Sequence, residues 1–169
     1  MNPQRSVILV GMPGAGKSTI GVQLAKELAL DFVDTDLLIQ LREGRALQDI
    51  MDDAGYLQLR HIEEQTLLEA FLPRHVIATG GSAVYGQEGM RHLRGFGPVV
   101  FLDASLAELK RRIHNYESRG IARRPEQSFE DLFAERRALY QQVADITIEC
   151  DNKNQQQILD ELCVALAAV

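Results

Sequence analysis

Tryptophan is absent from this 169-residue sequence, cysteine occurs only twice, and aromatic residues make up only 6 % of the chain. Cys150 and Cys163 match no metal-ligand spacing, so we expect two free thiols in a reducing cytoplasm. No apolar run approaches the roughly 18 residues of a membrane span, and the four apolar residues before Gly11 are too few for a signal peptide. A net charge of −6, with so few aromatic side chains for stacking, argues against nucleic acid and anionic membranes as partners.

What the sequence does contain is an alternation of short apolar runs with longer amphipathic stretches. The apolar runs predict strands at 6–10, 31–33, 75–78, 98–102 and 145–150. The amphipathic stretches predict helices at 17–30, 45–72 with a break near Gly55, 105–116, 129–144 and 155–167. This alternation predicts parallel βαβ units, and so an α/β fold in three layers (α/β/α) around a central five-stranded parallel sheet. Ligands of such sheets bind at the carboxyl ends of the strands.

A glycine-rich turn joins the first predicted strand to the first predicted helix. Its sequence, GMPGAGKS at 11–18, matches G-x-x-x-x-G-K-S, and its glycines can adopt positive φ so that backbone N–H groups converge on phosphate oxygens. We expect Lys17 to reach the β- and γ-phosphates of a nucleoside triphosphate and Ser18 to ligate Mg²⁺, with Thr19 as a second candidate. The turn therefore predicts a nucleoside triphosphate site without naming the acceptor.

Two aspartates follow the second predicted strand, in the sequence DTD at 34–36. Residues two apart in an extended stretch point the same way, so both carboxylates can face the phosphate loop. One of them is suited to Mg²⁺, directly or through water, and the other to orienting or deprotonating an acceptor hydroxyl. The alternative is that they cap a helix, since aspartate is a favoured cap residue. Because the pair comes one βα unit after the phosphate loop, we favour the functional interpretation.

Arg60 lies three residues before Glu63 on the helix predicted over 56–71. Two interpretations stay open. The spacing alone favours a solvated ion pair within the helix, whereas the functional alternative is that Glu63 directs the Arg60 guanidinium toward a carboxylate of the substrate. The glycines at 80–81, after the third strand, either allow a ligand to approach the backbone closely or only form a tight turn.

Arginines also gather late in the chain, in RGIARRPEQSF at 119–129, although the protein is acidic overall. This irregular stretch is either a solvated loop or a lid that grips anions. Arg111 and Arg112, at the end of the helix predicted over 105–116, either complement the dipole of that helix or stack on adenine.

Taken in order, these motifs resemble those of shikimate kinases. GMPGAGKSTIG, DTD, R-x-x-E at Arg60–Glu63, GG at 80–81, an arginine-containing lid and ERRALYQQVAD at 135–145 cover nearly the whole chain. The resemblance implies one kinase domain over 1–169, of the nucleoside-monophosphate-kinase type, with acceptor-binding helices at about 35–72 and a mobile lid at about 114–128. It also implies transfer of the ATP γ-phosphate to the 3-hydroxyl of shikimate, with Mg²⁺, as a step toward aromatic amino acids, and we take a monomer as the default.

The resemblance also assigns roles to individual residues. Lys17, Asp36 and a lid arginine are the catalytic candidates, with Asp36 as the base that binds the acceptor hydroxyl. For the lid arginine, Arg124 beside Pro125 is the first candidate and Arg119 beside Gly120 the second. The nucleotide would contact Gly14, Ala15, Gly16, Lys17, Ser18, Thr19, Arg112, Arg119 and Arg124. The acceptor would contact Asp36, Arg60, Gly80, Gly81 and Arg136, and Ser18 with Asp34 would serve Mg²⁺.

The sequence departs from the family pattern on the acceptor side and in the lid. Ser82 stands where a third glycine is usual, the lid reads RRPEQ in place of RPLL and is longer, and Leu59 and Tyr56 replace an aromatic and an acidic residue. The alternative acceptor is another small hydroxy acid, such as a gluconate-like sugar acid. A nucleotide-binding regulatory module is a third interpretation, and the presence of Asp36, Arg60 and Arg136 weighs against it.

Overall fold

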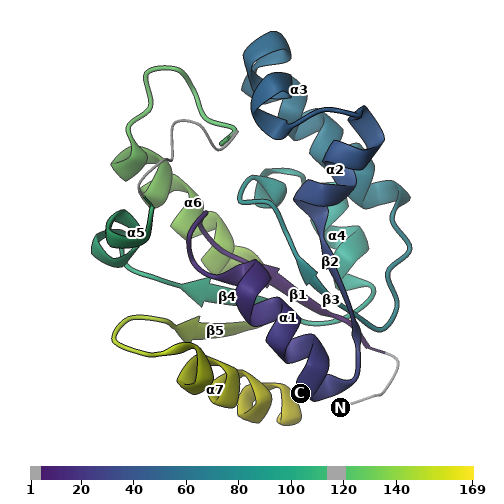
Figure 1. The fold of residues 1–169 in the computed structure, drawn as a ribbon, viewed down its shortest axis with the longest axis vertical. Helices are drawn as coiled ribbons and strands as arrows, with labels where there is room; N and C mark the ends of the chain where they lie inside the picture. Colours follow the sequence, from purple (N-terminus) through teal and green to yellow (C-terminus); the bar gives the residue numbers. More distant parts are fainter. Residues whose placement is uncertain (1–4, 114–120) are drawn as a thin grey trace.

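A computed structural model describes residues 5–113 and 121–169 (Figure 1). Its strands are β1 (Val7–Val10), β2 (Asp31–Asp34), β3 (His75–Ala78), β4 (Val99–Asp103) and β5 (Ile146–Glu149). They form one sheet in the order β2-β3-β1-β4-β5, and every neighbouring pair is parallel. The predicted α/β fold with a five-stranded parallel sheet is confirmed.

The periodicity predicted the helices that begin at Lys17, Leu47, Leu106, Phe129 and Gln155, whereas those at 35–43, 83–85 and 87–94 were not predicted by it. The helices are α1 (Lys17–Leu28), α2 (Thr35–Glu43), α3 (Leu47–Glu69), the 3-10 helix η1 (Ala83–Tyr85), α4 (Gln87–Arg94), α5 (Leu106–Arg112), α6 (Phe129–Val143) and α7 (Gln155–Ala167). The predicted break in the long helix is present, because Gly55 has φ 80° and ψ 170° inside α3. Among the described residues, no helix combines the length and the apolar character that crossing a membrane requires.

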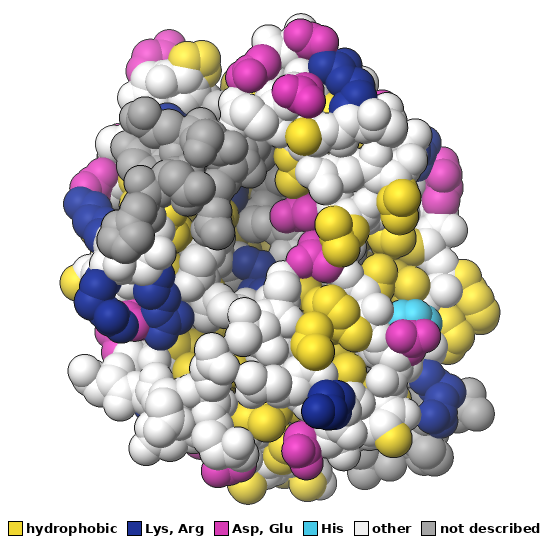
Figure 2. All heavy atoms as spheres, viewed as in Figure 1, with side chains coloured by type: hydrophobic (Ala, Val, Ile, Leu, Met, Phe, Trp, Pro, Cys, Tyr) yellow, Lys and Arg dark blue, Asp and Glu magenta, His cyan; other side chains and the backbone are white. Residues whose placement is uncertain are grey.

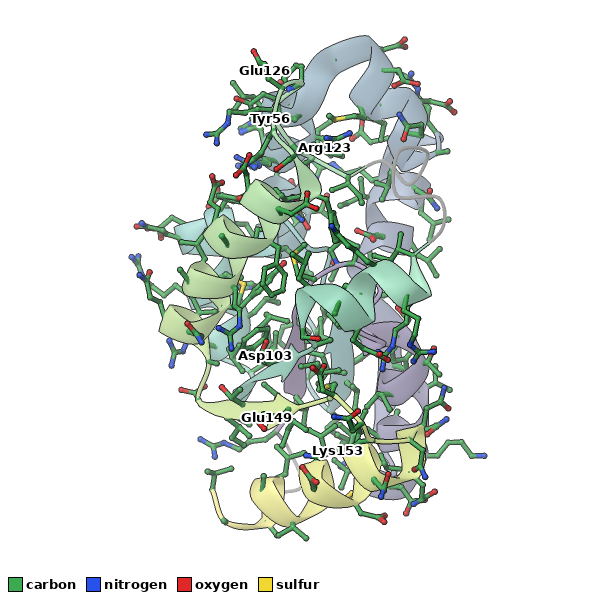
Figure 3. All side chains as sticks on the ribbon, turned by 90° about the vertical axis from the view of Figure 1, so that its left-hand side faces the viewer. Tyr56, Asp103, Arg123, Glu126, Glu149 and Lys153 are labelled. Carbon is green, nitrogen blue, oxygen red and sulfur yellow. The ribbon has the colours of Figure 1, made fainter. Side chains whose placement is uncertain are left out.

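The sheet is covered on both faces. Helices α1 and α7 contact each other on one face, and Figures 1 and 3 show α4 and α6 on the opposite face. Strands β1 and β4 are buried along their whole length, so their continuous apolar runs form the centre of the main core. A second, smaller core lies apart from it and joins α2, α3 and the segment before α6 through Ile39, Ile50, Leu59 and Ala122.

Two local features differ from what the pattern indicated. Helix α4 was not predicted, because its short sequence contains Gly89 and few apolar residues. Tertiary packing accounts for it, since Met90 and Leu93 are buried and Gly89 lies against Leu67 of α3. The predicted helix at 45–72 ends early, at Glu69, and Phe71 is 79 % exposed instead of completing its apolar face.

Candidate active site

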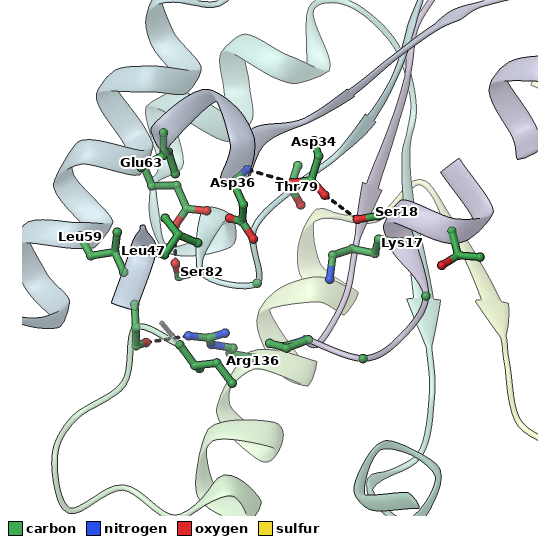
Figure 4. Close-up of a pocket in the computed structure, with 18 of the residues that line it drawn as sticks. Lys17, Ser18, Asp34, Asp36, Leu47, Leu59, Glu63, Thr79, Ser82 and Arg136 are labelled. Atoms are coloured by element: carbon green, nitrogen blue, oxygen red, sulfur yellow. Dashed lines mark hydrogen bonds between the residues drawn. The ribbon is translucent and has the colours of Figure 1, made fainter. Parts of the chain in front are cut away.

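One cleft, with a volume of about 460 Å³, opens at the carboxyl ends of the strands. Figure 2 shows a hollow on this face with acidic and basic side chains at its margin. The cleft brings together most of the predicted site residues, and Figure 4 shows several of them around it. Those that line it are Gly14, Gly16, Lys17, Ser18, Thr19, Asp34, Asp36, Gly81, Arg112 and Arg136.

The phosphate loop has the backbone that its glycines permit. Gly14 and Gly16 have φ values of 85° and 99°, in the left-handed region that a side chain disfavours. The Lys17 ammonium is buried and donates hydrogen bonds to the carbonyl oxygens of Gly11, at 2.7 Å, and Met12, at 3.0 Å. Burial lowers the pKa of Lys17 to about 8, against the opposing effect of nearby aspartates. The loop therefore presents a desolvated cation, which interacts strongly with a phosphate oxygen.

Of the two arginines that end α5, only Arg112 lies beside the phosphate loop. Its Nη1 donates to the carbonyl oxygens of Gly14 and Ala15, each at 3.4 Å, while its Nε donates to Glu108 at 2.7 Å. Arg111 pairs with the same glutamate through Nε and Nη2, and its side chain is 73 % exposed. Arg112 is therefore the arginine placed to contact a nucleotide.

Asp34 caps helix α2, the alternative considered for the DTD motif, and it also contacts Ser18 of the phosphate loop. Its Oδ2 accepts a hydrogen bond of 2.5 Å from the Ser18 hydroxyl, and its Oδ1 accepts one of 3.0 Å from the backbone N–H of Asp36, as the N-cap of α2. The expectation that both aspartates belong to one extended stretch is wrong, because Asp36 lies in the first turn of α2. The cap nevertheless aims both carboxylates into the same cleft.

Asp36 and Glu63 meet above the α-carbon of Gly80. A Cβ on that glycine would lie 2.6 Å from Asp36 Oδ1 and 2.3 Å from Glu63 Oε1, so no other residue fits there without displacing a carboxylate. Burial raises the pKa of Asp36 to about 6, and the charge of Asp34 adds to the effect. Burial, with a contribution from Asp36, raises the pKa of Glu63 to about 7. Gly80 thus leaves room for two carboxyl groups of this chain, and the approach of a ligand to its backbone stays a prediction.

The solvated ion pair expected between Arg60 and Glu63 is wrong. Glu63 is only 2 % exposed, and its Oε2 accepts a hydrogen bond from the hydroxyl of Ser82. The guanidinium of Arg60 instead stacks on Tyr85, with Cζ 3.5 Å from the centroid of the ring. A salt bridge between Arg60 and Glu63 is not among those formed by the described residues, because each group has a different partner.

Two guanidinium groups converge on one backbone oxygen at the acceptor end of the cleft. The carbonyl oxygen of Ala122 accepts a hydrogen bond of 3.2 Å from Arg60 Nη2 and one of 2.6 Å from Arg136 Nη2. The Nε atoms of both arginines are buried and have no hydrogen-bond partner within the part of the chain that the structure describes. Each of the two arginines therefore retains one buried donor without a partner, and guanidinium groups with free donors can bind a carboxylate.

The described part of the lid, residues 121–128, covers this end of the cleft through Ile121 and Ala122. Arg124, the first candidate for a phosphate contact, lies instead beside Glu135, with its Nη2 3.2 Å from Oε2, and it does not line the cleft. Its role in phosphate binding stays a prediction. Arg119, the second candidate, and Gly120 lie outside the described residues.

Two tyrosines support the site and were not predicted. Tyr85 stacks on Arg60 and donates a hydrogen bond of 2.5 Å to Glu135. Tyr140 is fully buried and donates one of 2.6 Å to the carbonyl oxygen of Gly81. A signal existed for Tyr140, because it follows Arg136 by four residues and so lies on the same face of α6.

Comparison with known proteins agrees with this geometry. The family model described as shikimate kinase matches residues 13–167. A shikimate kinase from Pseudomonas syringae pv. tomato is 39 % identical over 166 residues, which cover 96 % of each chain. One from Haemophilus influenzae (strain PittEE) is 36 % identical over 166 residues, covering 96 % of this chain and 92 % of that protein.

Solved structures lead to the same group of proteins. The structure of the Acinetobacter baumannii shikimate kinase in complex with shikimate superposes with a TM-score of 0.86 and 28 % identity, covering 98 % of this chain and 94 % of that one. A gluconokinase from Sinorhizobium meliloti 1021 superposes with a TM-score of 0.57 and 18 % identity, covering 99 % of this chain and 94 % of that one, so it shares the fold.

Proposed function

The chain belongs to the shikimate kinase family and is an ATP-dependent kinase that phosphorylates shikimate, and we propose that the cleft above the sheet holds both substrates. The observation that carries this proposal is that Arg136 lines the cleft that begins with the phosphate loop, and that Arg60, which does not itself line the cleft, meets it at the carbonyl oxygen of Ala122. Two guanidinium groups at the end of the cleft away from the phosphate loop suit a carboxylated acceptor, because planar guanidinium groups bind carboxylates through paired hydrogen bonds.

We propose that Asp36 lies between the two substrates. The pKa of its carboxyl responds to Lys17 on the phosphate side and to Arg136 on the acceptor side, so both cations are near it. In this position it accepts a hydrogen bond, and then the proton, from the acceptor hydroxyl as the bond to phosphorus forms. Gly80 and Gly81 let the acceptor ring approach the backbone, since a Cβ on Gly81 would lie 2.7 Å from Arg136 Nη1.

At the phosphate end, backbone N–H groups of the loop, Lys17 and Arg112 neutralise and orient the triphosphate of ATP. Ser18 and Asp34 fit a Mg²⁺ ion, because they offer a hydroxyl and a carboxylate oxygen 2.5 Å apart in the cleft, and Mg²⁺ prefers such donors. When bound, Mg²⁺ neutralises charge on the β- and γ-phosphates. Positioning and charge neutralisation suffice for a loose phosphoryl-transfer transition state.

We further propose that a single chain, folded as one domain, forms the complete enzyme in the reducing cytoplasm. The phosphate loop and Arg136 line one and the same cleft, and both cysteines carry free thiols. Lid closure over ATP would exclude the water that competes with the acceptor.

The direct test is ADP release coupled to a spectrophotometric readout, with shikimate and gluconate offered separately. We expect shikimate to stimulate ADP release well above the basal hydrolysis of ATP, and gluconate to leave it near the basal rate. Stimulation by gluconate but not by shikimate would overturn the assignment of the acceptor while leaving the kinase chemistry intact.

Replacing Arg136 with alanine should raise the KM for shikimate by about 10- to 100-fold, because a charge-assisted pair of hydrogen bonds to the carboxylate is lost. The KM for ATP and the kcat should change much less. Arg137→Ala is the matched control, since the next side chain on α6 pairs with Asp103 and does not line the cleft. An unchanged KM for shikimate in Arg136→Ala would remove this arginine from the carboxylate site.

A further inference from the structure

Ser82 is not part of the family pattern, and its surroundings suggest a specific task. It is 8 % exposed, lines the cleft, and donates its hydroxyl hydrogen bond to Glu63 Oε2. The second oxygen of the same carboxyl, Oε1, is buried and has no hydrogen-bond partner among the described residues. Figure 4 shows the Glu63 carboxyl with one oxygen toward Ser82 and the other on the side of Asp36.

An unpartnered buried carboxylate oxygen is costly, since it has lost its water and gained no donor. A ligand that donates a hydrogen bond to this oxygen would remove that cost. This oxygen lies beside Asp36 and above Gly80, and both Glu63 and Asp36 line the cleft in which the acceptor is proposed to bind. A ligand that satisfies it must bring a hydrogen-bond donor, and the hydroxyl groups of a carboxylated polyol are donors of that kind.

We propose that Ser82 is a positioning residue that fixes Glu63, so that the free oxygen of Glu63 accepts a hydrogen bond from a second hydroxyl of the acceptor, next to the one that is phosphorylated. This inference rests on the proposed function, because it places a hydroxylated acceptor in the same cleft. It makes the enzyme specific for an acceptor with neighbouring hydroxyl groups, whereas Arg60 and Arg136 require only a carboxylate.

The separation of Glu63 from Arg60 is what makes this task possible. Tyr85 holds the Arg60 guanidinium by stacking, at 3.5 Å from Cζ to the ring centroid, so the arginine does not need the glutamate. Ser82, which replaces a glycine of the family pattern, supplies the hydroxyl that holds the glutamate instead. In this chain two separate contacts therefore hold the two groups, Tyr85 for the carboxylate-binding arginine and Ser82 for the hydroxyl-binding glutamate.

The contact between Ser82 and Glu63 can be measured through the pKa of the Glu63 carboxyl. Burial and Asp36 of α2 raise the pKa of Glu63, while the hydrogen bond from Ser82, Arg136 of α6 and Arg60 of α3 lower it, with the result near 7. Lys17 of α1 and Tyr140 of α6 also interact with this carboxyl. Because the Ser82 hydrogen bond stabilises the ionised form, its loss should raise the pKa of Glu63 by about one unit.

The experiment compares Ser82→Ala with the wild-type enzyme, and uses Thr66→Val as the matched control. Thr66 is a buried hydroxyl residue of α3 that donates to the carbonyl oxygen of Ile62, so its replacement removes a buried hydroxyl without contacting Glu63. The Glu63 carboxyl is titrated by ¹³C NMR in glutamate-labelled protein, with the signal assigned from Glu63→Gln. We expect the titration to move up by about one pH unit in Ser82→Ala and to stay in place in Thr66→Val.

The kinetic readout is the KM for shikimate and for its 4-deoxy and 5-deoxy analogues. We expect Ser82→Ala to raise the KM for shikimate and for the 5-deoxy analogue about 10-fold at pH 7, and to leave unchanged the KM for the 4-deoxy analogue, which lacks the hydroxyl next to the phosphorylated one. Ser82→Thr keeps the hydroxyl and should restore both the titration and the KM, which also covers a failure of the alanine variant to fold. An unshifted Glu63 titration, or an equal KM penalty with all three acceptors, overturns the inference. Absence of shikimate-dependent ADP release in the wild type would instead overturn the proposed function.

Discussion

Replacing Lys17 with alanine should lower kcat by at least about 1,000-fold with every acceptor, because charge neutralisation on the transferred phosphate is lost. The ammonium is buried beneath the loop and held by two carbonyl oxygens, so it is in place before ATP arrives. Burial also leaves it poorly hydrated, as its pKa of about 8 indicates. A preorganised, poorly hydrated cation contributes more to a phosphoryl-transfer transition state than one that must first shed its water.

The loss of rate should not reflect unfolding. A buried ammonium carries a desolvation cost, so its removal is expected to leave the thermal midpoint nearly unchanged or slightly raised. Lys26→Ala is the control, because Lys26 lies exposed in the last turn of the same helix. The measurements are ADP release and a thermal melt on each variant. Retention of a tenth of the wild-type kcat in Lys17→Ala would contradict the assigned role.

The part of the site that could be predicted from the sequence is the part encoded in contiguous residues. The phosphate loop needs glycines, a lysine and a serine at fixed spacing, and each has a backbone or side-chain reason to be there. Asp34 was predictable for the same reason, since the end of β2 and the start of α2 are set by a few neighbouring residues. Neighbouring residues determine the geometry of a short turn, and most of the phosphate end of the cleft is built from residues that are neighbours in the sequence.

The acceptor end could not be derived in this way, because its contacts join residues far apart in the chain. Ser82 and Glu63 are separated by 19 positions, and Arg60 meets the carbonyl of Ala122 across 62. The helical spacing of Arg60 and Glu63 therefore indicated a pair that tertiary packing does not form. Burial decides the outcome there, since an exposed ion pair contributes little and a buried carboxyl must find a donor.

The lid illustrates a further limit. Its arginines were expected to contact phosphates because of their position in the chain, yet Arg124 lies beside Glu135 and the lid carbonyl of Ala122 occupies the two acceptor-site arginines. A backbone carbonyl carries no sequence signal, so no motif could have indicated that contact. Figure 3 shows Tyr56 and Arg123 at the same end of the molecule, where the lid segment approaches α3.

Replacing Asp36 with asparagine should lower kcat by about 100- to 10,000-fold, the range expected when a general base is removed, and should leave the KM for ATP nearly unchanged. Asparagine keeps the shape of the side chain and leaves the cap from Asp34 to the backbone N–H of residue 36 in place, but it cannot take a proton. Asp49→Asn is the control, because Asp49 is an exposed aspartate in the first turn of α3. A variant that kept more than a tenth of the wild-type kcat would show that the acceptor hydroxyl loses its proton elsewhere.

The pH profile separates this role from simple binding. Burial raises the pKa of Asp36 to about 6, so the carboxylate is ionised above that pH and protonated below it. The kcat of the wild-type enzyme, measured with saturating shikimate, should therefore fall as the pH drops through about 6. In Asp36→Asn the small remaining kcat should not fall as the pH drops through about 6, because the carboxyl group that titrates there is gone. The two groups to which we assign the proton of the acceptor hydroxyl and the charge of the phosphate, Asp36 and Lys17, thus have pKa values that burial has moved toward each other from opposite ends of the scale.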